Sequence, residues 1–329
     1  MPDPLRCLLA VVLTAGASAV VALALGRWKL PVGWAEVISL AAGLAVGSVV
    51  LRLPLVWPPI NGLGRLLTIV VPAALVVELI ASWSWARRRA WCLRFVLAMG
   101  AGPVLLRGSV YLSGVSPEWP PWQAALVLTL SGVLLFAEWV LLTKLSRRSG
   151  GISVSLSVAA AVLCGGVAVM FAGYVAGGLA ALPLSVALCG CVVMSGWLNG
   201  GDDLCEGILT IGVVGLFGLL YVGRFFGQLS TERAVVLFLA PLAGWLVELP
   251  LFRRQLTWRI ALCRLVLVGI PLAIVLLFAK RDFDRDMRPL LGRSHDATTQ
   301  VSRVGPASLR APAHRERRQA SGIRKNRLT

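Results

Sequence analysis

Residues 152–174 read ISVSLSVAAAVLCGGVAVMFAGY, a run of 23 residues without a charged side chain. A helix of about 20 apolar residues is long enough to cross a hydrocarbon core of about 30 Å. Comparable segments recur along the chain, and the breaks between them are short and polar or rich in arginine. The sequence therefore predicts a chain that crosses a membrane many times.

The composition agrees with this prediction. Of 329 residues, 57% are hydrophobic and 14% are charged, and the mean hydropathy is +0.81, whereas about a quarter of a soluble domain is charged. We predict an all-α, polytopic transmembrane helical bundle in residues 1–282. The predicted spans are 5–25, 34–51, 64–83, 91–113, 122–143, 152–174, 178–198, 207–226, 234–252 and 260–279. Ten spans are preferred, and nine are the alternative.

Residues 283–329 form a basic tail that is predicted to be disordered, because large apolar residues are too few there to offset the entropy of ordering. The net charge of +17 comes largely from this tail and from arginines beside apolar spans. Membrane topology accounts for such arginines, so nucleic acid is not an expected partner. Membrane lipids are, and the tail is a candidate for contact with anionic lipid. Loop arginines and the basic tail lie on opposite sides of a ten-span bundle, which leaves its orientation open.

Charged residues at predicted membrane depth are the candidates for a polar or substrate pathway. They are Glu78, Glu138, Glu248, Arg94, Arg107 and Arg264. A charge at the centre of a spanning helix costs about 2.5–3.5 kcal/mol on insertion scales, so each should face protein or water and have a partner. Glu78 and Arg94 are 16 residues apart across one predicted turn, as are Glu248 and Arg264 across another. This spacing predicts two ion pairs.

The two pairs belong to a longer matching pattern. Glu-Leu begins each copy, an arginine follows at the same distance, and the copies end in RFVL at 94–97 and RLVL at 264–267. A shift of six predicted spans relates the copies, which indicates a parallel repeat of a helical hairpin. Chance recurrence of the abundant Arg and Leu is the alternative interpretation.

Glu138 is predicted to share the depth of both pairs, because its spacing to Arg147 matches the spacing of Glu78 to Arg87. Three glutamates and two arginines at one level would then surround a polar cavity. The alternative is that each pair locks its own hairpin, while the arginine stems extend toward the headgroups.

The loop after the seventh predicted span is acidic, and Asp202, Asp203 and Glu206 are weak candidates for cation binding. A solvated turn that caps the next helix is the alternative. Both histidines, His295 and His314, lie in the predicted tail, and the seven cysteines form no CxxC pair. We therefore expect no metal site and no cofactor.

Glycines crowd the sixth to eighth predicted spans and allow helices to approach closely. They are Gly165, Gly166, Gly173, Gly177, Gly178, Gly212, Gly215 and Gly218. We interpret them as packing positions within the bundle or in a homo- or hetero-oligomer.

The sequence leaves three functions open for a multi-pass protein of the cell membrane. The first is a permease-like or lipid-handling protein that uses the glutamates and arginines, and the second is a noncatalytic scaffold or assembly partner. A membrane-embedded transferase ranks last, because no general base with a partner is found, and an enzyme is the less expected outcome. Ten spans with short loops are broadly similar to the drug/metabolite transporter superfamily, although the parallel hairpin repeat departs from its five-plus-five plan.

Overall fold

The computed structural model describes residues 3–28, 31–53, 55–83, 87–109, 111–112, 120–149, 151–199, 206–248 and 257–303. Its helices are α1 (Pro4–Arg27), α2 (Val32–Val50), α3 (Gly62–Arg65), η1 (Leu66–Val70), α4 (Val71–Ala81), α5 (Arg87–Leu106), α6 (Pro121–Ser149), α7 (Gly151–Phe171), α8 (Val175–Asn199), α9 (Glu206–Phe226), α10 (Thr231–Leu239), η2 (Ala240–Glu248) and α11 (Thr257–Arg303). The short elements η1 and η2 are a π-helix and a 3₁₀-helix.

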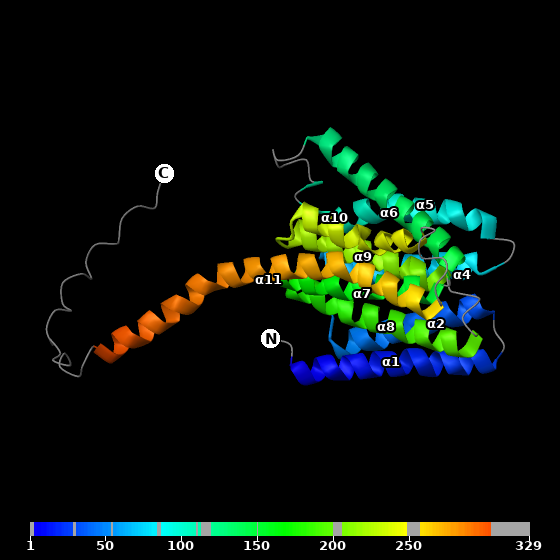
Figure 1. The fold of residues 1–329 in the computed structure, drawn as a ribbon. Coiled ribbons are helices and arrows are strands. Elements are labelled where there is room, and N and C mark those ends of the chain that lie inside the picture. The colour runs from blue at the N-terminus through cyan, green and yellow to red at the C-terminus, as the bar shows by residue number, and fades with distance from the viewer. Residues whose placement is uncertain are drawn as a thin grey trace, which may run out of the picture. The chain divides into compact units, whose positions relative to one another are not determined.

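The structure is all-α, as predicted. Nine helices within the described ranges are long and apolar enough to cross a membrane, and those ranges contain no strand. Most helices of the bundle, among them α1, α7, α8 and α9, run side by side along a similar direction, whereas α6 is inclined to them (Figure 1). The prediction of a polytopic helical bundle is therefore confirmed.

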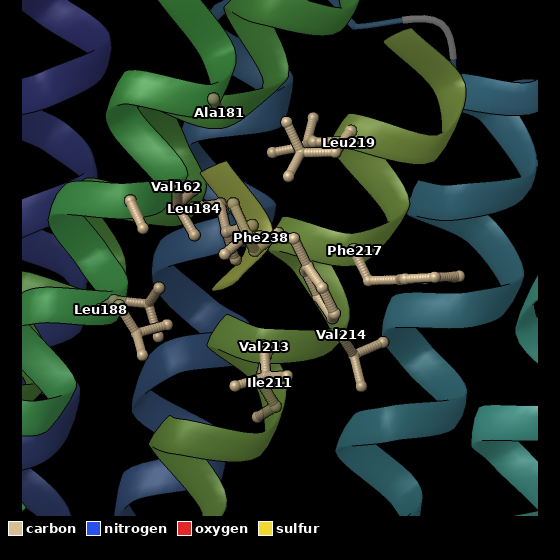
Figure 2. Packing of buried hydrophobic residues seen from close by; sticks show 14 of the residues in the cluster. Val162, Ala181, Leu184, Leu188, Ile211, Val213, Val214, Phe217, Leu219 and Phe238 are labelled. Atoms are coloured by element: carbon tan, nitrogen blue, oxygen red, sulfur yellow. The ribbon is translucent and has the colours of Figure 1, made fainter. Parts of the chain in front are cut away.

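Helix α9 forms the centre of the bundle. Each of its residues from Ile208 to Gly223 is buried. Figure 2 shows Val213 and Phe217 of α9 among side chains of neighbouring helices, including Leu184 of α8 and Phe238 of α10. A spanning helix that is apolar on all sides is buried by other helices, whereas α1 buries only a stripe of small residues four apart, from Ala10 to Ala22. Helix α1 therefore lies at the edge.

The glycines of α7 and α8 bring these two helices close together. A Cβ atom on Gly166 would lie 3.1 Å from the carbonyl oxygen of Gly178 and 2.2 Å from the Cβ of Ala181. Gly212, Gly215 and Gly218 of α9 likewise face side chains of the same chain. These glycines thus serve packing inside the bundle, and association of separate chains through them stays a prediction.

The predicted span 234–252 is built as two consecutive short helices, α10 and η2. Helix α9 begins beside Arg147, which contacts Glu206, and η2 ends near the neighbouring Arg148, which lies over the Trp245 ring. The segment between them must therefore return across the bundle. Nine α-helical and nine 3₁₀ residues extend about 30 Å, which matches the hydrocarbon thickness. The described chain thus has nine helical segments long and apolar enough to cross a membrane besides this two-part segment, and a tenth span stays a prediction.

Helix α5 is shorter than the predicted span 91–113. It ends at Leu106, and Gly108 follows with a left-handed φ of 71° that terminates the helix. Arg107 is an exposed residue of this turn, and its predicted position at membrane depth stays a prediction. It lies at the opposite end of α5 from Arg94, so the structure separates it from the other candidates.

Helix α11 continues through residue 283, where disorder was predicted to begin. The chain divides into two units, Met1–Arg281 and Asp282–Thr329, and the helix is described as far as Arg303. Extension of an existing helix needs no new nucleus, which permits α11 to continue beyond the apolar span. Residues 304–329 lie outside the described chain, and disorder there stays a prediction.

Candidate functional site

Glu78 and Arg94 form a buried ion pair between α4 and α5. The Nε and Nη2 atoms of Arg94 donate to the two carboxylate oxygens of Glu78 at 2.8 and 2.6 Å. Both side chains are only 3% exposed. Two parallel hydrogen bonds to one carboxylate are the strongest geometry that arginine offers. The first predicted pair is confirmed.

Arg94 also joins a wider network of charges. Its Nη1 lies 3.4 Å from Glu206 at the start of α9, and Arg147 of α6 donates to the other oxygen of Glu206 from Nε at 2.7 Å. The guanidinium lies 5.0 Å from the centre of the Trp91 ring and 5.5 Å from that of Trp139. Aromatic faces attract a cation, most strongly where water is excluded. Four helices are thereby tied together at one level.

Glu248 and Arg264 form the second predicted pair, which is also confirmed. Nη2 of Arg264 donates to Glu248 at 2.8 Å, and Nη1 donates to the hydroxyl of Ser153 at the start of α7. Arg264 is fully buried, whereas Glu248 is 20% exposed. A Cβ on Gly244 would lie 3.1 Å from the Arg264 stem, so the absence of a side chain there makes room for it.

Both hairpins contain an irregular helical turn near a proline, but the turns differ in type and place. The π-helix η1 precedes Pro72 and Glu78 lies in the α-helix that follows, whereas Pro241 and Glu248 both lie in the 3₁₀-helix η2. Proline removes a backbone donor and perturbs the regular helical ladder. The two ion pairs agree with the predicted repeat, whereas the helices before them differ, and the parallel repeat itself stays a prediction. We refer to Glu78, Arg94, Glu206, Arg147, Glu248 and Arg264 as the charged layer.

Glu138 differs from the paired glutamates. Its side chain is 1% exposed, and neither carboxylate oxygen has a hydrogen-bond partner among the described residues. On α6 it precedes Leu145 by seven residues, nearly two turns, so both occupy one face and Glu138 lies about 10 Å farther into the bundle. Leu145 packs at the level of Gly244 and the Arg264 stem. Glu138 is therefore displaced along α6 from the level of Arg264, whereas the contact of Arg94 with the adjacent Trp139 places the first ion pair close to its level.

The remaining sequence candidates fall into two groups. Asp202 and Asp203 lie outside the described residues. Glu206, the third member of the acidic loop, accepts hydrogen bonds from Arg94 and Arg147, so both of its carboxylate oxygens already have cationic partners. Within the described ranges, no group of three or more His, Cys, Asp or Glu side chains could hold a metal ion.

One buried polar cluster was not among the sequence candidates for a site. The Ser195 hydroxyl of α8 donates to Glu36 of α2 at 2.8 Å, and the Ser39 hydroxyl lies 3.3 Å from the sulfur of Cys191. Glu36 is a recognisable carboxylate at the start of an apolar span. Its serine partner lies 159 residues away in sequence, so no local spacing indicates the contact.

The fold and these charges define a class, a multi-pass helical membrane protein with an ionic layer near one end of its bundle. No protein-family model matches the chain, and no curated protein matches it.

Proposed function

We propose that this chain is a permease-like protein of the cell membrane in which Glu138 binds and releases a proton or another cation. The observation that supports the proposal is the burial of this carboxyl group without a partner among the described residues. Ionisable groups inside a membrane are expensive, and they are candidates for an ion or proton pathway. A buried carboxyl without a partner is least costly as the neutral acid, so ionisation would require water, a cation or a change of packing.

The charged layer has a different role in this proposal. Glu78 and Arg94 satisfy each other in a dry, bidentate geometry, and Arg264 is held by Glu248 and Ser153. Charged groups that already bind one another have few free hydrogen-bonding positions for a substrate. The layer therefore fixes the relative positions of the helices around Glu138.

The surroundings of Glu138 suit such a site. Two charged groups contact other residues of α6 near Glu138: Arg94 of α5 contacts the adjacent Trp139, and Arg264 lies at the level of Leu145. Helix α7 has no charged residue between Gly151 and Phe171. Both arginines are paired with carboxylates, so ionisation of Glu138 would depend on the entry of water or of a cation.

The first test follows the carboxyl group itself by infrared spectroscopy of the lipid-reconstituted full chain. We expect an acid carbonyl band that is absent in Glu138→Gln, changes with bulk pH and shifts on transfer to D₂O. Glu232→Gln, at an exposed position in the first turn of α10, is the matched control and should retain the band. A Glu138 band that neither titrates nor exchanges would refute proton binding from water.

The second test measures transport. Liposomes that enclose a pH-sensitive dye should acidify under an imposed membrane potential when they contain the wild-type chain or Glu232→Gln. Glu138→Gln should not support this uptake. Equal uptake by Glu138→Gln and wild type would remove Glu138 from the pathway.

A noncatalytic scaffold is the second candidate, and the dryness of the Glu78–Arg94 pair favours it. A pair with both side chains 3% exposed behaves as a lock rather than as a binding site. In that case Glu138 would be a neutral, inert acid, and neither infrared titration nor proton uptake would be observed. The two tests thus separate the candidates.

A further inference from the structure

A cavity of about 220 Å³ lies between α2, η1–α4, α8 and α9. Its lining is apolar, with Leu66, Leu75, Leu184 and Leu219 among its walls, and Ser48 supplies a hydroxyl. A cavity of about 150 Å³ with such walls stays dry and holds a benzene molecule, and a bound water needs two to four polar partners. The cavity therefore suits a hydrocarbon group rather than water or an ion.

One wall of the cavity is irregular. Leu66 and Leu67 belong to the π-helix η1, and Pro72 of the following helix also lines the space. A π turn is wider than an α turn, and such turns are frequent at functional sites. The widened turn helps to keep this wall from closing onto α2.

The cavity reaches the loop that follows α2. Leu55, in that loop, lines the cavity and is itself exposed. Val56, Trp57 and Ile60 of the same loop are also exposed large apolar side chains. Tryptophan and apolar side chains in a loop beside a spanning helix are typical of the headgroup level of a membrane. The opening is thus placed where lipid chains meet their headgroups.

Arg52 lies in sequence between two residues that line the cavity, Ser48 and Leu55, which brings its positive charge near this end of the cavity. Its guanidinium is exposed and has no partner among the described residues, whereas Arg65 donates to the carbonyl oxygens of Leu105 and Ile60. Arg52 also adopts a left-handed backbone with φ 50°. Glycine would adopt that conformation at a lower cost in backbone free energy, so an arginine at this position is less stable than a glycine would be.

We propose that this cavity binds one acyl chain of an anionic lipid, whose headgroup lies beside Arg52. The occupant must enter from the lipid phase, because the walls are apolar and the bundle spans the membrane. The cation at the opening selects negative headgroups. This lipid site does not involve Glu138. A negative result for lipid binding would therefore leave the proposed role of Glu138 as it stands.

The test compares two lipids on the delipidated full chain in detergent, with native mass spectrometry as the readout. Dioleoylphosphatidylglycerol should bind more tightly than dioleoylphosphatidylcholine. Arg52→Gln should weaken the phosphatidylglycerol complex about fivefold, the effect of one basic residue near an anionic surface, and leave phosphatidylcholine unchanged.

Filling the cavity should affect both lipids. Ala45→Phe places a ring in the lining and should lower binding of each lipid at least tenfold. Val49→Phe, one turn farther along α2, is the control, because Val49 is 67% exposed and is not part of the lining. Equal binding by Ala45→Phe and Val49→Phe would overturn the acyl-chain assignment. If Ala45→Phe does not fold, the exposed Arg52→Gln still decides, since an unchanged phosphatidylglycerol affinity overturns the proposal.

Discussion

Arg94→Ala should strongly destabilise the bundle, because it leaves Glu78 buried without its partner. The substitution removes two charge-assisted hydrogen bonds of 2.8 and 2.6 Å from a carboxylate that is 3% exposed. Breaking a buried pair by removing one member typically costs about 3–5 kcal/mol. The loss of packing against Trp139 adds to this cost.

The origin of the cost can be isolated with a second substitution. Glu78→Gln in the Arg94→Ala background removes the stranded charge and leaves an unsatisfied amide, which costs about 1–3 kcal/mol. We therefore expect a recovery of about 2 kcal/mol, or roughly thirtyfold in the ratio of folded to unfolded protein. Glu206→Gln in the same background should recover little, because Glu206 is partly exposed and keeps its contact with Arg147.

The assay is reversible unfolding of the purified chain in mixed detergent micelles, followed by tryptophan fluorescence. Arg107→Ala, in the exposed turn after α5, is the control and should stay within about 0.5 kcal/mol of wild type. Unchanged stability of Arg94→Ala, or equal recovery by Glu78→Gln and Glu206→Gln, would refute the buried-pair reasoning.

Two further predictions use the same assay. Glu248→Gln should lower the stability more than Glu78→Gln, although Glu248 is the more exposed residue. The fully buried Arg264 would then retain only Ser153 as a partner, whereas Arg94 keeps a second carboxylate, that of Glu206. The reverse order of stability would contradict this account. Gly166→Leu should separate α7 from α8 and lower the stability by several kcal/mol. The control is Gly100→Leu, which should be tolerated because a Cβ at Gly100 meets no atom within 4 Å. Similar stability of the two variants would argue against close packing of α7 and α8.

The two hairpin pairs could be predicted from sequence because both members lie in adjacent antiparallel helices. A short turn fixes the register of such a hairpin, so 16 residues between Glu78 and Arg94 bring them to one depth. Glu206 contacts Arg94 over 112 residues and Arg147 over 59. Those contacts depend on which helices surround α9, and no spacing in the sequence specifies that arrangement.

Other differences arise from local backbone chemistry that hydropathy does not measure. The apolar residues after Arg107 extended the predicted span, yet Gly108 ends the helix before them. Similarly, the ninth predicted span is a single apolar stretch in sequence, whereas Pro241 accompanies its division into α10 and η2. Both signals are visible in the sequence as a glycine and a proline. They alter backbone geometry without reducing hydropathy, so a search for apolar windows overlooks them.

Helix α4 connects the ion pair with the apolar cavity. Pro72 and Leu75 line the cavity, and Glu78 follows Leu75 by three residues, less than one turn along the same helix. A movement of α4 that closed the cavity would therefore carry Glu78 with it and disturb its two hydrogen bonds to Arg94. Since disruption of such a pair costs several kcal/mol, the pair restricts α4 to a narrow range of positions. The ion pair thus keeps the cavity wall in place in the free protein, and under the proposal of lipid binding such a preformed wall lowers the ordering cost.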